Sequence, residues 1–260
     1  MSAALEFRDV SVATASGRLL LSDVSFAVEE GTVTAILGRS GSGKTTLLRT
    51  ANRMIDVTRG EIHVAGRNAA EVNLVDLRRR MGYVIQETGL FPHFTIERNV
   101  AIVPEAEGQS RDRRIQRSNE LLRLVGLDPA SFSHRYPHQL SGGQRQRAGL
   151  ARALAGEPNI LLMDEPFGAL DPLTRAEMQD MLLNLLARMH TTVLLVTHDL
   201  DEALYLAQRI VLVSDGKIAA NLPRHEFLRS AQPEIVAYAQ ASHRGQRGTA
   251  PDRSGEGSHA

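Results

Sequence analysis

GRSGSGKT, residues 38–45, matches the phosphate-binding pattern G-x-x-x-x-G-K-[ST] at every defined position. The run before it, residues 32–37 (TVTAIL), is apolar and β-branched, as expected of a strand. Residues 47–55, which follow it, carry apolar side chains at helical spacing. A strand-to-helix turn is the setting that this pattern requires. We therefore interpret it as a phosphate-binding loop, the alternative being a Gly/Ser-rich linker that matches by chance.

The residue types of this loop, called the cradle below, suit a triphosphate. Glycines let the backbone curl until N–H groups point inward, and the helix that follows adds its positive end. Lys44 supplies a mobile cation, and the Thr45 hydroxyl can bind magnesium. The predicted ligand is Mg-ATP or a similar nucleotide. The residues expected to contact it are Gly38, Arg39, Ser40, Gly41, Ser42, Gly43, Lys44, Thr45 and Thr46.

The composition is that of an ordinary globular protein. Of 260 residues, 42% are hydrophobic, and 30 basic residues balance 30 acidic ones, which disfavours nucleic acid as a partner. The chain has no cysteine, and its first residues lack the pattern of a signal peptide, so a cytoplasmic location is expected. No run approaches the roughly 20 apolar residues that cross a bilayer. Any membrane role should therefore depend on a partner.

Strand and helix patterns alternate along most of the chain, which predicts an α/β fold with a parallel sheet covered by helices. We expect one domain, residues 1–241. Within it, residues 1–86 and 157–241 form a β lobe and a core, and residues 87–156 form a helical insert. The strands are expected within residues 5–37, 61–65, 81–85, 159–163, 191–197 and 210–213.

The composition of two further segments predicts their structure. In the expected helix 173–189, apolar residues recur every three or four positions, and a core stripe is favoured over a partner groove. Residues 242–260 contain Gly, Ser, Arg and His but no large apolar side chain. We expect a disordered tail there, because nothing in it offsets the entropy of ordering.

Two carboxylates, Asp164 and Glu165, follow the apolar run ILLM. This is the position at which a parallel sheet presents groups to a ligand. Adjacent strand residues point in opposite directions, so the two carboxylates can have different roles. We expect Asp164 to hold magnesium and Glu165 to orient or deprotonate the attacking water. An acidic turn at the strand end, before Pro166, is the alternative.

His198 also ends an apolar strand, where an imidazole can contact a γ-phosphate or the attacking water. A structural neighbour of a helix N-cap is the alternative. A second anion-binding helix start is expected at Ser141, Gly142, Gly143 and Gln144, before a helix-forming run. One sheet edge cannot easily bring both helix starts to one nucleotide. We therefore expect a two-fold dimer, with each ATP between the cradle of one copy and the second helix start of the other.

The order of these motifs resembles the ATP-binding cassette ATPases of ABC transporters over about residues 4–235. The LSGGQ run at 140–144 makes this resemblance highly specific. It implies a RecA-like P-loop NTPase core with an N-terminal antiparallel β lobe and an inserted helical subdomain. It also adds Gln86 (Q-loop) and Asp171 (D-loop, in ALD at 169–171) to the site.

The motifs and the resemblance together assign a role to each candidate residue. The candidate catalytic residues are Glu165, His198, Gln86 and Lys44. The candidate magnesium ligands are Thr45, Gln86 and Asp164. The nucleotide-binding set comprises the cradle with Thr46, the second helix start and Asp171. The resemblance further implies integral membrane permease subunits docked near the Gln86 loop, an extracytoplasmic solute-binding protein that acts indirectly, and a location at the cytoplasmic face of the membrane.

Residues 81–105, the YPHQLSGGQRQR run and LLMDEPFGALDP are similar to ATPases that import osmoprotectants such as glycine betaine and choline. The chain departs from that family twice. It is too short for the CBS pair of many relatives, which puts ionic-strength gating in doubt. Thr14 stands where an aromatic ring usually lies under adenine. Phe7 is the nearby ring, and we expect it in the core instead.

Three alternatives remain at this point. An importer of polar amino acids or other small solutes would show the same motifs, because the ATPase does not touch the solute. Soluble cassettes that act on DNA or ribosomes usually have tandem cassettes or a long coiled-coil insert. Another P-loop enzyme, such as a kinase, leaves LSGGQ unexplained.

The loop 89–95 (GLFPHFT) carries apolar residues that either dock a permease or pack on the helical insert.

Overall fold

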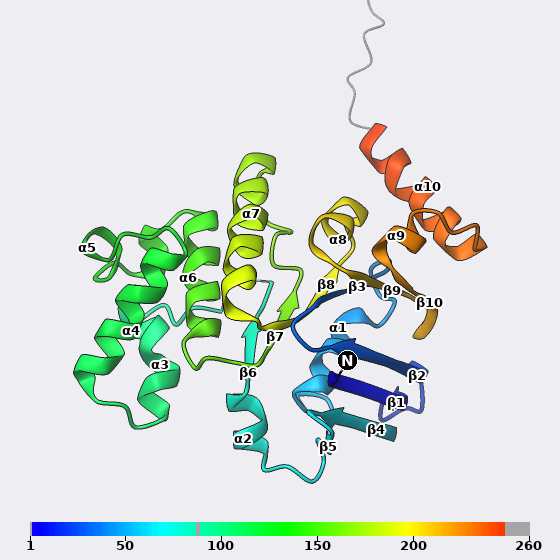
Figure 1. Ribbon diagram of the computed structural model, residues 1–260, viewed down its shortest axis with the longest axis horizontal. Coiled ribbons are helices and arrows are strands. Elements are labelled where there is room, and N and C mark those ends of the chain that lie inside the picture. The colour runs from blue at the N-terminus through cyan, green and yellow to red at the C-terminus, as the bar shows by residue number, and fades with distance from the viewer. Residues whose placement is uncertain (1, 87–88, 248–260) are drawn as a thin grey trace, which may run out of the picture.

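The computed structural model describes residues 2–86 and 89–247 (Figure 1). Strands and helices alternate much as the sequence predicts. The strands are β1 (Ala3–Ala13), β2 (Leu19–Glu29), β3 (Val33–Leu37), β4 (Arg59–Val64), β5 (Arg67–Asn68), β6 (Met81–Val84), β7 (Ile160–Asp164), β8 (Thr192–Thr197), β9 (Arg209–Ser214) and β10 (Lys217–Pro223). The helices are α1 (Lys44–Ala51), α2 (Leu74–Arg79), α3 (Ile96–Ala106), α4 (Arg111–Leu124), α5 (Pro129–Phe132), η1 (Pro137–Gln139), α6 (Gly142–Leu154), α7 (Pro172–Met189), α8 (Leu200–Leu206), α9 (Arg224–Phe227) and α10 (Pro233–Arg247).

The described strands form two sheets (Figure 1). One is antiparallel, with the order β2, β1, β4, β5, and forms the β lobe. The other has the order β10, β9, β3, β8, β7, β6. Its strands are parallel except β10, which forms a hairpin with β9. The expected fold class, a P-loop α/β core with an antiparallel β lobe and helices inserted between β6 and β7, is confirmed.

The parallel sheet is buried on both faces, as its continuous apolar strands require. In β8, Leu194 and Val196 face the cluster that contains α1 and the β lobe. Val193 and Leu195 face the opposite cluster, which contains α6, α7 and α8. This alternation follows from the two-residue period of a strand. It fixes β8 rigidly, so the residues that follow its carboxyl end have a defined position.

The helical segments agree with their sequence patterns. On α7, Met178, Leu182 and Leu185 are buried, and Met181, Leu186 and Met189 pack partly buried against the same cluster. The prediction of a core stripe is therefore confirmed. Helices α3, α4 and α6 pack on one another to one side of the sheet (Figure 1). Residues 87 and 88 of the expected insert lie outside the described residues.

The C-terminal part differs from the prediction. β10, α9 and α10 have no counterpart among the expected elements. Helix α10 runs to Arg247, so a tail that begins at residue 242 is wrong for residues 242–247. The physical reason is that Ile235 and Tyr238 bury apolar surface and fix the first turns, from which the helix extends. Residues 248–260 of the expected tail lie outside the described residues.

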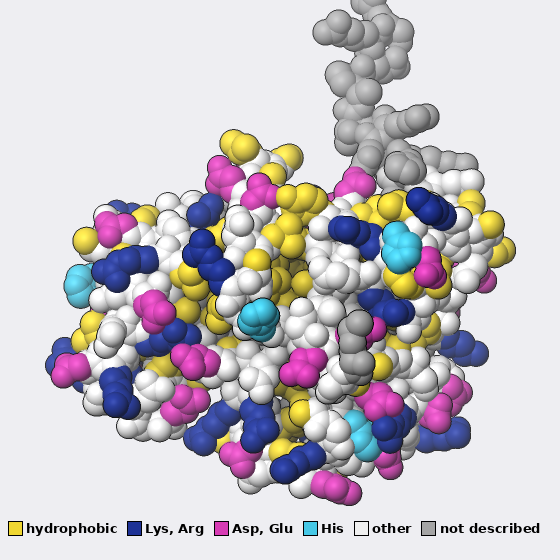
Figure 2. All heavy atoms as spheres, in the orientation of Figure 1, with side chains coloured by type: hydrophobic (Ala, Val, Ile, Leu, Met, Phe, Trp, Pro, Cys, Tyr) yellow, Lys and Arg dark blue, Asp and Glu magenta, His cyan; other side chains and the backbone are white. Residues whose placement is uncertain are grey.

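The surface agrees with the balanced composition. Basic and acidic side chains are interspersed over the face seen in Figure 2. None of the helices in the described part of the chain is both long enough and apolar enough to span a bilayer.

Candidate active site

The carboxyl ends of three neighbouring strands meet at one edge of the parallel sheet. Leu37 at the end of β3 pairs with Thr197 of β8, and Asp164 at the end of β7 pairs with Val196 of β8. The cradle, Glu165 and His198 directly follow these ends in sequence. Parallel pairing thus brings together segments more than 100 residues apart, at the edge where α/β sheets bind ligands.

The cradle needs its glycines for two different reasons. A Cβ on Gly38 would lie 2.3 Å from the backbone oxygen of Val213, so only glycine fits between the cradle and β9. Gly43 has φ of 106°, in the left-handed region that other residues avoid. The loop therefore keeps its backbone close to β9 while it turns into α1.

Lys44 reaches back over this loop. Its Nζ donates hydrogen bonds to the carbonyl oxygens of Gly38 and Arg39, at 2.8 and 2.9 Å. Burial lowers the pKa of the Lys44 ammonium, while the charges of Glu165 and Asp164 oppose that shift. The ammonium is thus held over the loop and partly desolvated, where an anion would interact with it strongly.

Thr45 and Asp164 are in contact, as the predicted magnesium site requires. The Thr45 hydroxyl donates to Asp164 Oδ1 at 2.8 Å. The other carboxylate oxygen of Asp164 accepts a bond from the Tyr83 hydroxyl at 3.4 Å and lies 3.7 Å from the Arg49 guanidinium. Tyr83 and Arg49 therefore orient Asp164. The sequence patterns did not indicate either residue, because Tyr83 reaches Asp164 through the pairing of β6 with β7 and Arg49 reaches it from α1.

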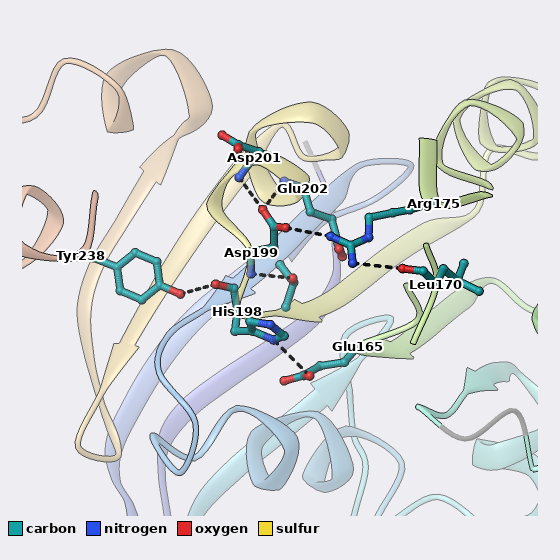
Figure 3. Close-up of polar contacts among 9 residues, drawn as sticks. Glu165, Leu170, Arg175, His198, Asp199, Asp201, Glu202 and Tyr238 are labelled. Carbon is teal, nitrogen blue, oxygen red and sulfur yellow. Dashed lines mark hydrogen bonds and ion pairs between the residues drawn. The ribbon is translucent and has the colours of Figure 1, made fainter. Parts of the chain in front are cut away.

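Glu165 and His198 face each other across this edge (Figure 3). Glu165 Oε2 lies 3.1 Å from His198 Nδ1. The backbone of Glu165 has φ of 45°, which is uncommon for a residue with a side chain and is often found at functional positions. The Glu165 N–H donates to the carbonyl of Val196 at 3.0 Å and so holds this conformation. Both predicted catalytic side chains are thus in one place.

A cavity of about 600 Å³ opens over the cradle. Eight predicted site residues converge there, namely Ser40, Gly41, Gly43, Lys44, Thr45, Thr46, Gln86 and Glu165. Residues that the sequence did not indicate complete its wall, namely Arg18, Leu19, Leu20, Asp215 and Gly216. The cavity is therefore large enough and polar enough for a nucleotide at the cradle.

The residues of the cradle and of the sheet edge beside this cavity fit a phosphate and a magnesium ion. Within the described residues, the Ser42 hydroxyl is buried without a hydrogen-bond partner, which points to a missing polar ligand at the cradle. A Cβ at Gly38 would also lie 2.7 Å from that hydroxyl. The Thr45 and Asp164 oxygens are of the hard type that magnesium prefers. The donor set therefore agrees with the predicted Mg-nucleotide.

The second predicted helix start lies apart from this cavity. Ser141 caps α6, its hydroxyl accepts a bond from Gln144 N, and the Gln144 side chain accepts one from Ser141 N. A Cβ on Gly143 would lie 2.5 Å from the Thr174 methyl group, so α6 and α7 begin side by side. Asp171 caps α7, and hydrogen bonds from Thr174 lower its pKa. These residues form a second polar group, made of two adjacent helix N-termini.

An ion pair connects the helix starts at Ser141 and Asp171 to the residues around His198. Arg175 on α7 lies 3.3 Å from Asp199, the residue after His198, and also donates to the carbonyl of Leu170 (Figure 3). Asp199 in turn caps α8. The LD pair at 170–171 and the His198 segment are therefore mechanically linked. A position next to a candidate histidine was the available signal for Asp199, whereas nothing local marked Arg175.

Glu202, on α8 behind this network, makes stability depend on pH. Burial, then the charge of Asp199, raises the pKa of its carboxyl to about 8. The folded state therefore keeps a proton that the unfolded chain releases near pH 4.5. The free energy of unfolding should fall as pH rises from about 5 to 8, by at least about 1.4 kcal/mol, the equivalent of one pKa unit. Urea denaturation at pH 5.5 and 8.5 measures this slope, and Glu202→Gln should flatten it. An unchanged slope in that variant contradicts the assignment.

The structure also bears on the expected base contact. Thr14 is turned into its own hairpin, where its hydroxyl accepts a bond from Arg18 N at 3.1 Å and lies 2.9 Å from the Ser16 hydroxyl. Phe7 is buried and stacks on Phe26, with ring centroids 4.5 Å apart, so its predicted place in the core is confirmed. The cavity wall on this side consists of Arg18, Leu19 and Leu20.

We therefore expect weak ATP binding and poor discrimination against GTP in the isolated chain. Thr14→Tyr should tighten ATP about tenfold, because base–aromatic stacking is worth about 1–3 kcal/mol. Phe7→Ala should instead lower the free energy of unfolding by about 3–5 kcal/mol without a selective loss of affinity. Titration of both variants with a fluorescent nucleotide shows whether position 14 or Phe7 contacts the base. Unchanged affinity in Thr14→Tyr, together with a loss in folded Phe7→Ala, would assign the platform to Phe7.

Comparison with known proteins places this geometry in context. A family model described as ABC transporter matches residues 21–168. The choline transport ATP-binding protein OpuBA of Bacillus subtilis is 43% identical over 89% of this chain, which spans 61% of OpuBA. The glycine betaine uptake system ATP-binding protein YehX of Escherichia coli is 46% identical over 82% of this chain and 69% of its own length. A solved dimeric ATP-binding cassette in a post-hydrolysis state, bound to ADP and Pi, matches with a TM-score of 0.77 and 31% identity, covering 85% of this chain and 98% of that structure.

Proposed function

This chain belongs to the ABC transporter family, and from that premise we propose that it is the ATP-binding and ATP-hydrolysing subunit of a membrane importer. One observation carries the proposal. The Glu165–His198 pair and the Thr45–Asp164 pair lie at the same sheet edge, and both Glu165 and Asp164 interact with the charge of the Lys44 ammonium. A base, a cation site and a phosphate cradle therefore converge on one cavity, as phosphoryl transfer to water requires.

In this mechanism each side chain acts on the triphosphate or on the attacking water. The N–H groups of the cradle and Lys44 hold the β- and γ-phosphates. Glu165 orients the water and accepts its proton, while His198 keeps the Glu165 carboxylate in place at 3.1 Å. Gln86, exposed at the cavity wall, completes the set on the side of β6.

Magnesium, when bound, would neutralise charge on the phosphate oxygens. Thr45 and Asp164 would hold it, with Gln86 as the third ligand implied by the family. Tyr83 and Arg49 stabilise the Asp164 carboxylate in the required orientation.

We also propose that two copies share each nucleotide. The helix starts at Ser141 and Asp171 are separate from the cradle of the same copy, so they are available to a triphosphate bound by another. The dimeric solved relative, which has ADP and Pi bound, supports this arrangement. Residues 87–156 would then move as a helical subdomain within the domain 1–241 when the dimer closes.

The proposed permease contact is the loop that follows Gln86. Asn99 is buried and holds this loop from below, because it accepts a bond from Phe91 N at 2.7 Å and donates to the carbonyls of Phe91 and Phe94 at 3.1 Å. Phe91 is 40% exposed, and Phe94 packs under the Arg98 guanidinium. Leu90, in contrast, packs against the core. The loop therefore has a rigid base and an exposed aromatic tip, which is typical of a contact surface.

Phe91→Ala tests this surface. We expect basal ATPase activity within about twofold of wild type and a loss of ATP-driven uptake, because the ring is exposed and its removal leaves the Asn99 bonds in place. Proteoliposomes that contain the permease give both readings from one preparation. Leu90→Ala is the matched control for local packing and should lower stability instead. If Phe91→Ala unfolds the protein, the loop packs on the helical insert and the docking proposal fails.

The proposed solute is a quaternary amine such as glycine betaine or choline. Relatives named for transport of these solutes support it, although the chain spans only about three fifths of the first such relatives. The chain would act at the cytoplasmic face of the membrane, on permease subunits. These would receive the solute from an extracytoplasmic solute-binding protein.

Affinity purification of the tagged chain from solubilised membranes tests this function. We expect an integral membrane pair to copurify and ATP to drive uptake of labelled glycine betaine or choline by the reconstituted complex. Uptake of a polar amino acid alone would correct the solute. Copurified nucleic acid without a membrane protein would contradict the importer assignment.

A further inference from the structure

Tyr238 connects the C-terminal helix to the candidate active site. It lies on α10 and is 9% exposed, and its ring belongs to the cluster that covers the sheet opposite the β lobe. Its hydroxyl donates a hydrogen bond to the backbone carbonyl of His198 at 2.7 Å (Figure 3). A buried tyrosine hydroxyl needs a partner, and here the partner belongs to the segment that presents the imidazole to Glu165.

Tyr238 also lies beside the cradle. Burial, then the charge of Asp199, raises the pKa of Tyr238 to about 12. The hydroxyl is therefore neutral and can accept one bond and donate another at physiological pH. Beside it, a cavity of about 360 Å³ separates α10 from residues 39–42 of the cradle. Tyr238 thus bonds the His198 segment and lines the same cavity as the cradle.

This arrangement differs from simple packing of a helix on a core. The apolar contacts of the Tyr238 ring and of Ile235 suffice to bury this face of α10, and a phenylalanine would make the same ring contacts. The hydroxyl adds a hydrogen bond that fixes the His198 backbone, after the end of β8, relative to α10. His198 itself is exposed, and no neighbour other than Glu165 is bonded to its ring in the described structure, so its position depends on its backbone.

We propose that Tyr238 is a positioning residue for ATP hydrolysis. Its hydroxyl ties the His198 backbone to α10, beside the cradle, and so holds the imidazole in place against Glu165. The proposal rests on the hydrolytic function proposed above. It follows that displacement of α10 would lower turnover without closing the nucleotide site.

Tyr238→Phe keeps the ring and removes the hydroxyl. We expect kcat for ATP to fall about fivefold, the equivalent of one hydrogen bond, with the Kd for ATP within twofold of wild type. Tyr205→Phe is the matched control, because Tyr205 is exposed on α8 and its hydroxyl bonds Asp180 of α7, and neither residue lines the two cavities at the cradle. It should leave kcat unchanged. An equal loss in both variants would overturn the proposal, as would a Tyr238→Phe protein that unfolds or one with wild-type kcat.

A double-mutant cycle gives a reading that a purely structural role would not produce. In a His198→Ala background, Tyr238→Phe should cause no further loss of kcat, because the group that it positions is absent. A fivefold loss in both backgrounds would assign the hydroxyl to packing and overturn the proposal. The wild-type reaction distinguishes a failure of the proposed function from a failure of the role proposed for Tyr238. A wild-type chain that releases no phosphate from Mg-ATP defeats the proposed function, whereas an active wild type with an equally active Tyr238→Phe defeats only this inference.

Discussion

Glu165→Gln is expected to bind ATP with unchanged affinity and to hydrolyse it about 10²–10⁴-fold more slowly, the usual contribution of a general base. The amide keeps the shape of the side chain and its place 3.1 Å from His198, but it cannot accept a proton from water. Asp164 and Thr45, which are expected to hold magnesium, are untouched by this change. The nucleotide should therefore remain bound and unhydrolysed.

A second consequence is that the dimer should accumulate. Because hydrolysis separates the two copies in this account, the variant should run as a dimer with ATP and as a monomer without it. Phosphate release and size-exclusion chromatography measure the two effects. Glu120→Gln, which makes the same chemical change at an exposed position on α4, should behave as wild type. A Glu165→Gln protein that stays monomeric and fully active would refute the role of the carboxylate.

Lys44→Ala is expected to act on binding itself, with a loss of ATP affinity of at least tenfold. A hydrogen bond to a charged group contributes about 1.5–3 kcal/mol, and the Lys44 ammonium lies over the cradle in a partly desolvated position. It has two carbonyl partners in the structure, Gly38 and Arg39, so the variant also loses the bonds that shape the loop. We therefore expect the loss to be larger for ATP than for adenosine.

The sequence offers a matched control, because Lys217, on the exposed edge of β10, is its other lysine. Lys217→Ala should bind ATP as the wild type does. Equilibrium titration with ATP, ADP and adenosine measures the difference between the variants. Equal affinities in Lys44→Ala and wild type would show that the cradle binds phosphate without its cation.

The fold and the main site residues could be predicted because their signals are local. GRSGSGKT requires a strand before it and a helix after it, and both neighbours are visible in the sequence. Asp164, Glu165 and His198 follow apolar runs, and the ends of parallel strands share one edge. Pairing of β3 with β8 and of β8 with β7 then places them together without further information.

The residues that support the site could not be predicted, because they reach it from elements that are distant in sequence. Tyr83 orients Asp164 only through the pairing of β6 with β7. Arg175 meets Asp199 across the gap between α7 and α8. The end of α10 was misjudged because polar residues can extend a helix whose first turns, at Ile235 and Tyr238, are already packed.

The central claim is that the cradle of one copy and the helix start at Ser141 of another hold the same ATP. Disulfide cross-linking tests it directly, because the sequence has no cysteine of its own. Ser40 is exposed on the cradle, and a side chain at Gly142 would meet no atom within 4 Å. Both positions therefore accept cysteine in the Glu165→Gln background.

The measurement is the yield of covalent dimer on a non-reducing gel after a Ser40→Cys protein is mixed with a Gly142→Cys protein and oxidised. If two copies share each ATP, a strong dimer band is expected with Mg-ATP, little with ADP, and none with ATP when either protein is oxidised alone. A band of equal strength with and without ATP, or no band in a mixture that binds ATP, would contradict it.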